Sequence, residues 1–259
     1  RDRSPSRGLG DVYKRQAENF AETSLDEAIA QCHERGVKVF VTLNTLVTDD
    51  EFAALTAELD DIAKAQADAV IVQDMGVMSL IRARYPELPL YASTQTTVHN
   101  AEGAVLLDKL GFKQVVLARE LSAREIRAIQ AASPIQIECF VHGAHCMCMS
   151  GACYLSAMLG GRSGNRGLCA QPCRLNFKLG KKERALSLKD MCLIGHMDEL
   201  MQSGIHALKI EGRMKRPEYV AAVTGIYAAL LREHRAPTAD EQKKLALAFS
   251  RDGFTDGYY

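Results

Sequence analysis

Apolar and polar positions follow two patterns that succeed each other along the chain. Short apolar runs predict buried strands, and six occur, at 38–43, 69–72, 90–92, 114–117, 135–141 and 207–210. The stretches between them have apolar residues at helical spacing and predict helices at 24–35, 49–65, 78–85, 101–110, 122–131, 188–203 and 217–233. Ser24 and Ser122 stand where helix N-caps are expected. Short apolar strands separated by single helices indicate a parallel sheet built from βα units.

Two parallel-sheet folds fit this order of elements. No G-x-G-x-x-G motif follows the first strand, which counts against a dinucleotide-binding fold. The pattern therefore predicts an α/β protein with a TIM-type (β/α)8 barrel, for which ~250 residues is a typical complete length. Because six strands are found, we expect an N-terminally truncated barrel that lacks two strands upstream of Ala17. A cysteine-rich insertion follows a late strand.

The chain divides into three parts by composition. Residues 1–16 (RDRSPSRGLGDVYKRQ) are basic and lack apolar periodicity, so we interpret them as a non-native leader. Residues 17–235 form the expected incomplete barrel, including a cysteine-rich segment at 139–176. Residues 236–259 end in a turn-rich stretch and are expected to begin a truncated C-terminal extension.

The overall charge excludes a global attraction to nucleic acid or membrane. Lys plus Arg and Asp plus Glu both number 32, so the formal net charge is zero. No apolar run approaches the ~20 residues of a membrane span, and no secretory signal is visible, which predicts a cytoplasmic protein without membrane contact. The charge is uneven locally, because residues 160–184 carry seven basic side chains and one acidic one. This stretch is either a solvated loop or an anion-binding surface.

Four cysteines are spaced C-x6-C-x15-C-x3-C, at Cys146, Cys153, Cys169 and Cys173. Disulfides fit poorly, because six of the eight cysteines crowd between 139 and 173 in a chain with no export signal. Four thiolates from one segment suit zinc or an iron–sulfur cluster. Zinc favours tight C-x2-C pairs, so the wide spacing favours a [4Fe–4S] cluster.

The remaining cysteines are weaker candidates for ligands. Cys148 lies two residues after Cys146 and is a rival for its place. Cys139 and Cys32 lie in apolar stretches and are expected in the core. Cys192 is also expected in a helix, although the fold leaves it a route to the metal site.

Polar residues gather where the predicted strands end, which is where barrel enzymes build their active sites. The candidate catalytic residues are Glu138, His142, Glu211 and Arg213. The candidate substrate-binding residues there are Asn44, Gln95, Arg119 and Lys209. A carboxylate on an apolar strand needs a cationic partner, and for Glu138 we expect Lys209 or Arg213. Strand ends are also where loops begin, and this alone explains part of the set.

The connector GGRSGNRG, at 160–167, supplies two further candidates. Its backbone N–H groups and its arginines, Arg162 and Arg166, suit contact with phosphate or an RNA backbone. A flexible loop that only spaces the metal ligands is the alternative. His142 and His145 flank Cys146 and are expected to support the metal site from outside its ligand set.

Long stretches of the chain match one family. The stretches are ECFVHGAHCMCMSGACYLS, GRSGNRGLCAQPCR, SLKDMCLI and KIEGRMKRPEYV. AENF, STQ, VVLARELS and FSRDGFTDGYY extend the match over residues 17–259. In these motifs the chain resembles peptidase family U-32, also called the collagenase-like proteases.

The resemblance implies a TIM-type barrel with a cysteine-bearing insertion and a [4Fe–4S] cluster on Cys146, Cys153, Cys169 and Cys173. It implies hydroxylation of RNA, at a tRNA wobble uridine or a 23S rRNA cytidine, with prephenate as a source of the hydroxyl group. Other relatives support oxygen-independent ubiquinone hydroxylation. Cys148 departs from the family pattern.

Peptidase activity on collagen-like or other protein substrates is the alternative function. The sequence contains no G-x-S-x-G or H-E-x-x-H motif, although a dyad of Cys146 with His142 is conceivable. The partner is therefore expected to be RNA, or a peptide in the alternative. The oligomeric state stays open.

These interpretations make three structural demands. The four cysteines should converge on one point, with ligand sulfurs roughly 6–7 Å apart, as ~2.3 Å metal–sulfur bonds require. Their site should lie at the C-terminal mouth of the barrel and face Gln95, Arg119, Glu138 and Arg213. The basic stretch from Arg162 to Arg184 should border the site and hold RNA phosphates while a base is extruded.

Overall fold

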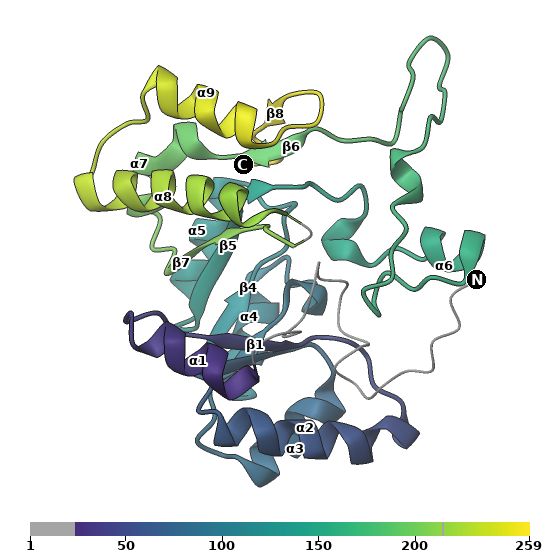
Figure 1. Ribbon diagram of the computed structural model, residues 1–259, viewed down its shortest axis with the longest axis vertical. Helices are drawn as coiled ribbons and strands as arrows, with labels where there is room; N and C mark the ends of the chain where they lie inside the picture. Colours follow the sequence, from purple (N-terminus) through teal and green to yellow (C-terminus); the bar gives the residue numbers. More distant parts are fainter. Residues whose placement is uncertain (1–23, 214) are drawn as a thin grey trace.

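The computed structural model describes residues 24–213 and 215–259 (Figure 1). The expected leader at 1–16 and the first residues of the expected barrel lie outside the described residues. Within the described part of the chain, no helix is both long and apolar enough to cross a bilayer.

The six predicted strands are all present. They are β1 (Phe40–Leu43), β2 (Ala69–Val72), β3 (Leu90–Ala92), β4 (Gln114–Val116), β5 (Gln136–Gly143) and β7 (Ala207–Ile210). Neighbours pair in parallel in the order β1-β2-β3-β4-β5-β7. Such pairing places the C-terminal ends of the strands, and the loops that follow them, along one edge of the sheet.

Helices connect these strands and pack against the sheet (Figure 1). The helices in this region are α1 (Leu25–His33), α2 (Phe52–Lys64), α3 (Met75–Arg84), α4 (Ala101–Lys109) and α5 (Ala123–Ala132). Ser122 caps α5 as predicted: its hydroxyl accepts from the Glu125 N–H, and the Glu125 carboxylate accepts from the Ser122 N–H. The side chains of Asp74 and Asn100 cap α3 and α4 by accepting from backbone N–H groups of the first turn.

The main core lies between these helices and the sheet. Leu43, Val70, Leu90, Val115 and Ile137 point from successive strands toward the helices and are almost fully buried. Alternate residues of the same strands face the other side. One continuous apolar layer therefore fixes the strands, and the opposite face of the sheet is left to carry polar groups.

A closed TIM-type barrel is not confirmed. The described strands form one open sheet, in which β1 pairs only with β2 and β7 pairs only with β5. Closure needs a hydrogen-bonded path from the last strand back to the first, and the described residues do not provide it. The fold that the structure shows is an α/β fold with a mostly parallel sheet.

The helix expected at 188–203 is a strand followed by a short helix. The structure has β6 (Asp190–Cys192) and then α7 (Met197–Gln202). Strand β6 pairs antiparallel with the end of β5 and parallel with β8 (Phe254–Thr255). Apolar residues at 188, 191, 194, 197 and 200 have helical spacing, but long-range strand pairing overrides that local pattern.

A β-bulge alters the direction of side chains near the end of β5. One extra residue lies between Phe140 and His142 in the pairing with β7. Phe140 therefore faces the polar side of the sheet, whereas His142 packs against Tyr219, Tyr227 and Phe254. Sequence alternation alone places both side chains on one face.

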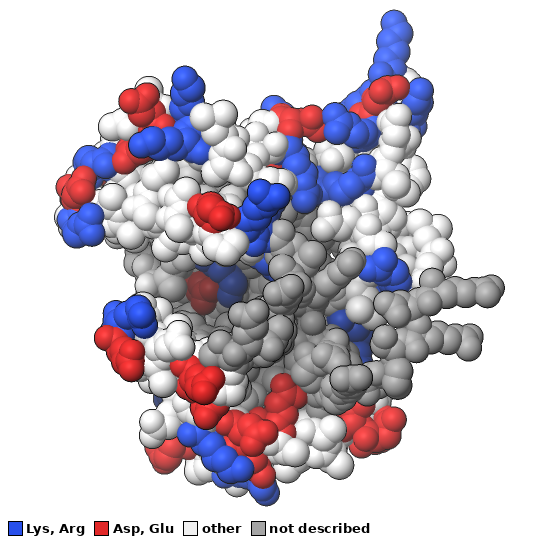
Figure 2. Space-filling view, in the orientation of Figure 1, with Lys and Arg blue, Asp and Glu red and all other residues white. Residues whose placement is uncertain are grey.

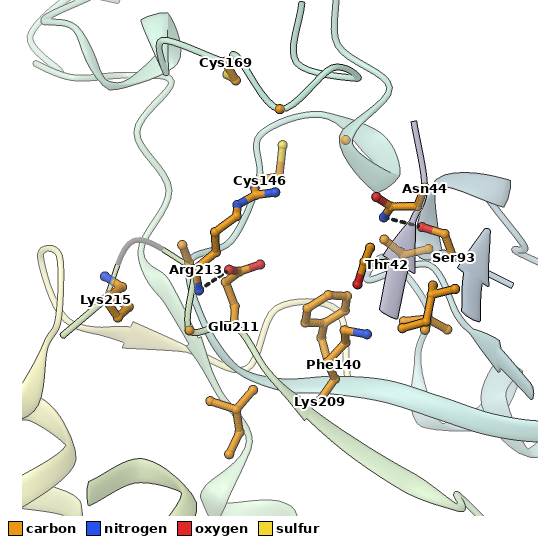
Figure 3. Close-up of a pocket in the computed structure, with 18 of the residues that line it drawn as sticks. Thr42, Asn44, Ser93, Phe140, Cys146, Cys169, Lys209, Glu211, Arg213 and Lys215 are labelled. Carbon is orange, nitrogen blue, oxygen red and sulfur yellow. Dashed lines mark hydrogen bonds between the residues drawn. The ribbon is translucent and has the colours of Figure 1, made fainter. Parts of the chain in front are cut away.

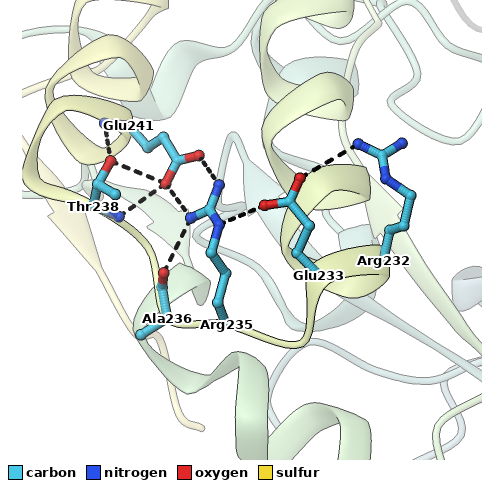
Figure 4. Close-up of polar contacts among 6 residues, drawn as sticks. All are labelled: Arg232, Glu233, Arg235, Ala236, Thr238 and Glu241. Atoms are coloured by element: carbon cyan, nitrogen blue, oxygen red, sulfur yellow. Dashed lines mark hydrogen bonds and ion pairs between the residues drawn. The ribbon is translucent and has the colours of Figure 1, made fainter.

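The last part of the chain packs onto α8 (Pro217–Glu233). Helix α9 (Ala239–Ala248) lies against α8, and the two helices are joined by an ion-pair network (Figure 4). Arg235 donates to Glu233 at 2.7 Å and to Glu241 at 2.6 Å. Glu241 also accepts from the N-cap Thr238, and Arg235 and Thr238 lower the pKa of Glu241 to about 2. The network fixes where α9 begins.

Candidate functional site

A large cavity lies on the polar side of the sheet, at the C-terminal ends of its strands (Figure 3). Its floor consists of inward-facing strand residues, namely Thr42, Ile71, Val116, Phe140 and Lys209. Strand-end residues form its wall, namely Asn44, Ser93, Gln95, Arg119, Glu211 and Arg213. The predicted site of chemistry at the strand ends therefore coincides with a cavity.

The four predicted metal ligands all line this cavity. They are Cys146, Cys153, Cys169 and Cys173, and each has a free thiol. Burial, opposed by Arg174, raises the pKa of Cys173, and the nearby thiols of Cys146, Cys169 and Cys153 raise that pKa further. Cys148 is close to Cys146 and Cys153 but does not line the cavity.

The sulfur atoms have surroundings that suit ligation to iron. The backbone N–H of Leu155 donates to the Cys153 Sγ at 3.3 Å, and that of Gln171 donates to the Cys169 Sγ at 3.3 Å. Hydrogen bonds of this kind tune iron–sulfur centres. Within the described residues, no three Cys, His, Asp or Glu side chains are grouped closely enough to hold a single metal ion. The four thiols line one cavity, but their convergence on one metal site stays a prediction.

Hydrogen bonds within the cysteine segment and to the chain around it hold its parts together. α6 (Leu155–Gly160) carries Ser156, whose hydroxyl accepts from the Ala170 N–H at 2.9 Å. Arg174 donates to the His145 carbonyl at 2.6 Å and to the Leu188 carbonyl at 2.7 Å. Arg174 therefore joins the beginning of the segment to the chain that follows the hairpin.

Arg166 anchors the segment to the loop after β1. It forms an ion pair with Glu51 and donates to the Leu46 carbonyl at 2.8 Å. Hydrogen bonds from Arg166 are the largest cause that lowers the pKa of Glu51, to about 2. Arg166 was expected to bind substrate, but the structure commits its guanidinium to these contacts. Arg162 is exposed and donates to the Leu168 carbonyl at 2.9 Å.

Two of the four basic side chains in residues 175–187 also form ion pairs. A hairpin at 175–187 projects from the molecule, and blue side chains mark it at the upper right of Figure 2. Lys178 pairs with Glu183 at 3.1 Å, and Arg184 pairs with Asp252 at 3.0 Å. These pairs are exposed and contribute little to stability.

Arg119 is the most buried cation of the cavity wall. Its guanidinium carbon lies 4.0 Å from the centre of the Phe140 ring, and its Nη2 lies 3.9 Å from the Glu211 Oε2. Burial lowers the pKa of Arg119, while Glu211 and Cys146 oppose that shift. Its Nε has no hydrogen-bond partner in the described structure. Because Arg119 lines the cavity, its guanidinium can donate to an oxygen atom of a ligand there.

Glu211 owes its position to a glycine. Gly143 has a φ of +113°, and a Cβ built there would lie 2.8 Å from both the Cβ and the carbonyl oxygen of Glu211. The Glu211 Oε1 accepts from the Arg213 N–H at 2.9 Å. Only glycine lets the two strand ends approach this closely.

Glu138 forms the predicted buried ion pair. Lys209, one of its two expected partners, lies with its Nζ 2.7 Å from the Glu138 Oε1. Gln114 donates to the other carboxylate oxygen. Glu138 itself is not part of the cavity lining, whereas Lys209 is. With both oxygens engaged, the carboxylate is better placed to orient Lys209 than to move a proton.

Asn44 and Ser93 form a polar pair on the opposite wall (Figure 3). The Asn44 Nδ2 donates to the Ser93 Oγ at 3.0 Å, and the Gln73 Nε2 donates to the Asn44 carbonyl at 2.7 Å. The Asn44 Oδ1 is buried and has no partner in the described structure. Gln95 lines the cavity nearby, as predicted.

The two histidines of the HGAH motif separate. His142 lies outside the cavity among aromatic rings, and burial lowers its pKa to about 4. The structure therefore does not bring it to Cys146, and its candidate catalytic role gains no support from its place. His145 lines the cavity, with its pKa lowered by burial and by Arg119.

The sequence analysis missed several cavity residues. Lys215, Tyr219, Phe249 and Arg251 all line the wall formed by α8 and α9. Lys215 follows the sixth predicted strand closely, as Glu211 and Arg213 do, so position could have indicated it. Phe249 and Arg251 come from the expected extension, and nothing in the sequence places that part beside the strands.

An open, mostly parallel α/β sheet with a cysteine-lined cavity at its strand ends defines the class of this protein. The model of peptidase family U32 matches residues 8–259. The chain therefore belongs to that family.

Three curated relatives show the range of the family. The chain is 41% identical over 213 residues to the 23S rRNA 5-hydroxycytidine C2501 synthase of Escherichia coli, covering 79% of this chain and 32% of that protein. It is 35% identical to a collagenase of Porphyromonas gingivalis, covering 95% of this chain and 65% of that protein. It is 33% identical to the tRNA hydroxylation protein P of Helicobacter pylori strain 26695, covering 95% and 64%. The chain thus spans about a third to two thirds of the length of these relatives.

Proposed function

We propose that this protein hydroxylates an RNA base and holds a [4Fe–4S] cluster on Cys146, Cys153, Cys169 and Cys173. The observation that carries the proposal is the meeting of four free thiols with the strand-end polar residues in one cavity. The names of two relatives support RNA as the substrate, either a tRNA or 23S rRNA. We further propose a tRNA wobble uridine or a 23S rRNA cytidine as the target and prephenate as the source of the hydroxyl group.

The cluster would supply a site for electron transfer or for binding an oxygen-containing ligand at iron. The protein side chains would do the positioning. Arg119 would hold a carbonyl or carboxylate oxygen through its buried donors, and Phe140 would keep water from that contact. Asn44 would read the edge of a base through its unpartnered amide oxygen. A base must leave its stack to reach this cavity.

Two measurements test the proposal. Protein purified without oxygen should be coloured and should contain iron and sulfide, and Cys146→Ala, Cys153→Ala, Cys169→Ala or Cys173→Ala should abolish the absorbance. Cys148→Ala serves as the matched control and should retain it. Transcribed tRNA or 23S rRNA fragments incubated with the loaded protein and prephenate should gain one oxygen atom on a base, as seen by mass spectrometry. Protein without iron under these conditions, or cysteine variants that keep the full spectrum, would refute the cluster.

Peptidase activity is the second candidate, favoured by the collagenase among the relatives. A cysteine peptidase needs a base beside its nucleophile, and His142 lies among aromatic side chains away from the cavity. His145 is the histidine that lines the cavity with Cys146. Cleavage of gelatin by iron-free protein that is lost in His145→Gln, with no RNA product, would favour the peptidase.

A further inference from the structure

Two cations on the cavity wall share one aromatic ring and form no ion pair with any described residue. Lys215 precedes α8, and Arg251 lies between α9 and β8. The Lys215 Nζ lies against the face of Phe249, and the Arg251 guanidinium carbon lies 5.4 Å from the centre of that ring. Lys215 also lies 5.4 Å from the ring centre of Tyr219. Within the described structure, neither charged group forms an ion pair.

The electrostatic surroundings of Lys215 disfavour its charge. Burial and the nearby charge of Arg251 lower the pKa of Lys215 to about 8, and Asp190 and Glu211 oppose this shift. The buried Asp190 accepts at Oδ2 from the Arg251 N–H at 2.8 Å, and its Oδ1 has no hydrogen-bond partner in the described structure. Two like charges gathered on a half-buried wall are unfavourable unless an anion joins them.

We propose that Lys215 and Arg251 form an oxyanion-binding subsite of the cavity, which takes a carboxylate or phosphate group. Arginine offers a planar fork of donors and lysine a point charge, and both bind such oxygens well. Phe249 and Tyr219 hold the two cations in place and limit the water around them. Figure 3 shows Lys215 on the same side of the cavity as Glu211 and Arg213. The subsite goes beyond the proposed function, and its occupation requires neither the cluster nor RNA modification.

The oxyanion has two possible sources, a small organic acid or the phosphodiester backbone of a nucleic acid. Calorimetric titrations with inorganic phosphate and with malonate at pH 7 measure the subsite directly. Lys215→Met and Arg251→Met should each weaken binding by about tenfold or more, because each removes a charge-assisted contact. Lys178→Met removes an equal charge from the exposed hairpin and should leave binding unchanged.

Proton uptake provides a second measurement. An anion favours the charged form of Lys215, so binding at pH 8 should take up protons in the wild-type protein and not in Lys215→Met. The uptake is read from titrations in buffers of different ionisation enthalpy. Lys215→Arg should restore much of the affinity and not the proton uptake, which separates loss of charge from loss of fold.

Three outcomes decide the matter. Weakened binding in both cavity variants supports the subsite, and equal binding in all variants overturns it. Lys215→Met that lowers stability as much as Asp190→Asn, with phosphate binding intact, shows that Lys215 pairs with Asp190 instead and also overturns it. Once binding is established, displacement of phosphate by a short single-stranded oligonucleotide identifies the phosphodiester source, and displacement by malonate alone identifies a small acid.

Discussion

Gly143→Ala tests whether the close approach of two strand ends builds the cavity. A Cβ at this position would overlap the Cβ and carbonyl oxygen of Glu211 at 2.8 Å, which backbone movement must relieve. Overpacking of this kind costs about 1–3 kcal/mol. The φ of +113° is rarely adopted by residues with a side chain, and forcing it costs about 1–3 kcal/mol more. We therefore expect a loss of about 2–6 kcal/mol in the free energy of unfolding.

Gly36→Ala is the matched control. Gly36 also has a positive φ, +69°, but a Cβ there meets nothing within 4 Å. This variant should lose only the conformational part, about 1–2 kcal/mol. Urea unfolding followed by circular dichroism gives both values. If the two variants lose equal stability, the overlap with Glu211 does not exist and the explanation of this glycine is wrong.

Three further predictions concern charged side chains of the described fold. The pKa of His142 is about 4 in the folded state and about 6.5 when unfolded, so its neutral form stabilises the fold above pH 6.5. That contribution to the free energy of unfolding, about 3 kcal/mol, should be lost as the pH falls from 6.5 to 4. Over the same pH range, His142→Phe should lose less of its unfolding free energy, as measured by urea unfolding. Lys209→Met leaves the Glu138 carboxylate buried without its cation and should cost about 3–5 kcal/mol, whereas adding Glu138→Gln should recover part of it in a double-mutant cycle. Arg166→Met should speed limited proteolysis of the cysteine segment, since the ion pair with Glu51 anchors it; Arg162→Met is the control, and equal rates would contradict the anchoring role.

The sequence predicts the strands well because each is a short apolar run buried against helices. It also predicts the strand-end polar groups, and the Glu138–Lys209 pair follows from the cost of burying a lone carboxylate. The features that the sequence does not predict depend on contacts between residues far apart in the chain. Strand β6 forms through pairing with β5, although its residues also fit a helical pattern. Closure of the sheet depends on hydrogen bonds between distant segments, which apolar periodicity does not reveal.

In the candidate site, too, the sequence predicts what depends on local position and misses what depends on distant contacts. The four cysteines line one cavity, because their segment follows the C-terminal end of β5. Their convergence on a single point stays a prediction. His142 was expected near Cys146, and the β-bulge before it turns its side chain into the aromatic core. A single inserted residue in a strand leaves no mark in the apolar pattern. Nearness in sequence therefore suggested Cys146 as the neighbour of His142, whereas the structure places the His142 ring beside aromatic side chains.

The contacts of the arginines in the cysteine segment bear on where the proposed RNA binding is expected. The local excess of basic residues predicts a surface for phosphates. In the structure, however, Arg166 forms an ion pair with Glu51, and Arg174 donates to two backbone carbonyls. Their charge holds the loop that carries the thiols, so neutralising them would disturb the cysteines as well as any RNA. Lys215 and Arg251 form no ion pair with any described residue, and both line the cavity. Salt-dependent binding should therefore respond more cleanly to changes at these two residues than to changes in the basic stretch.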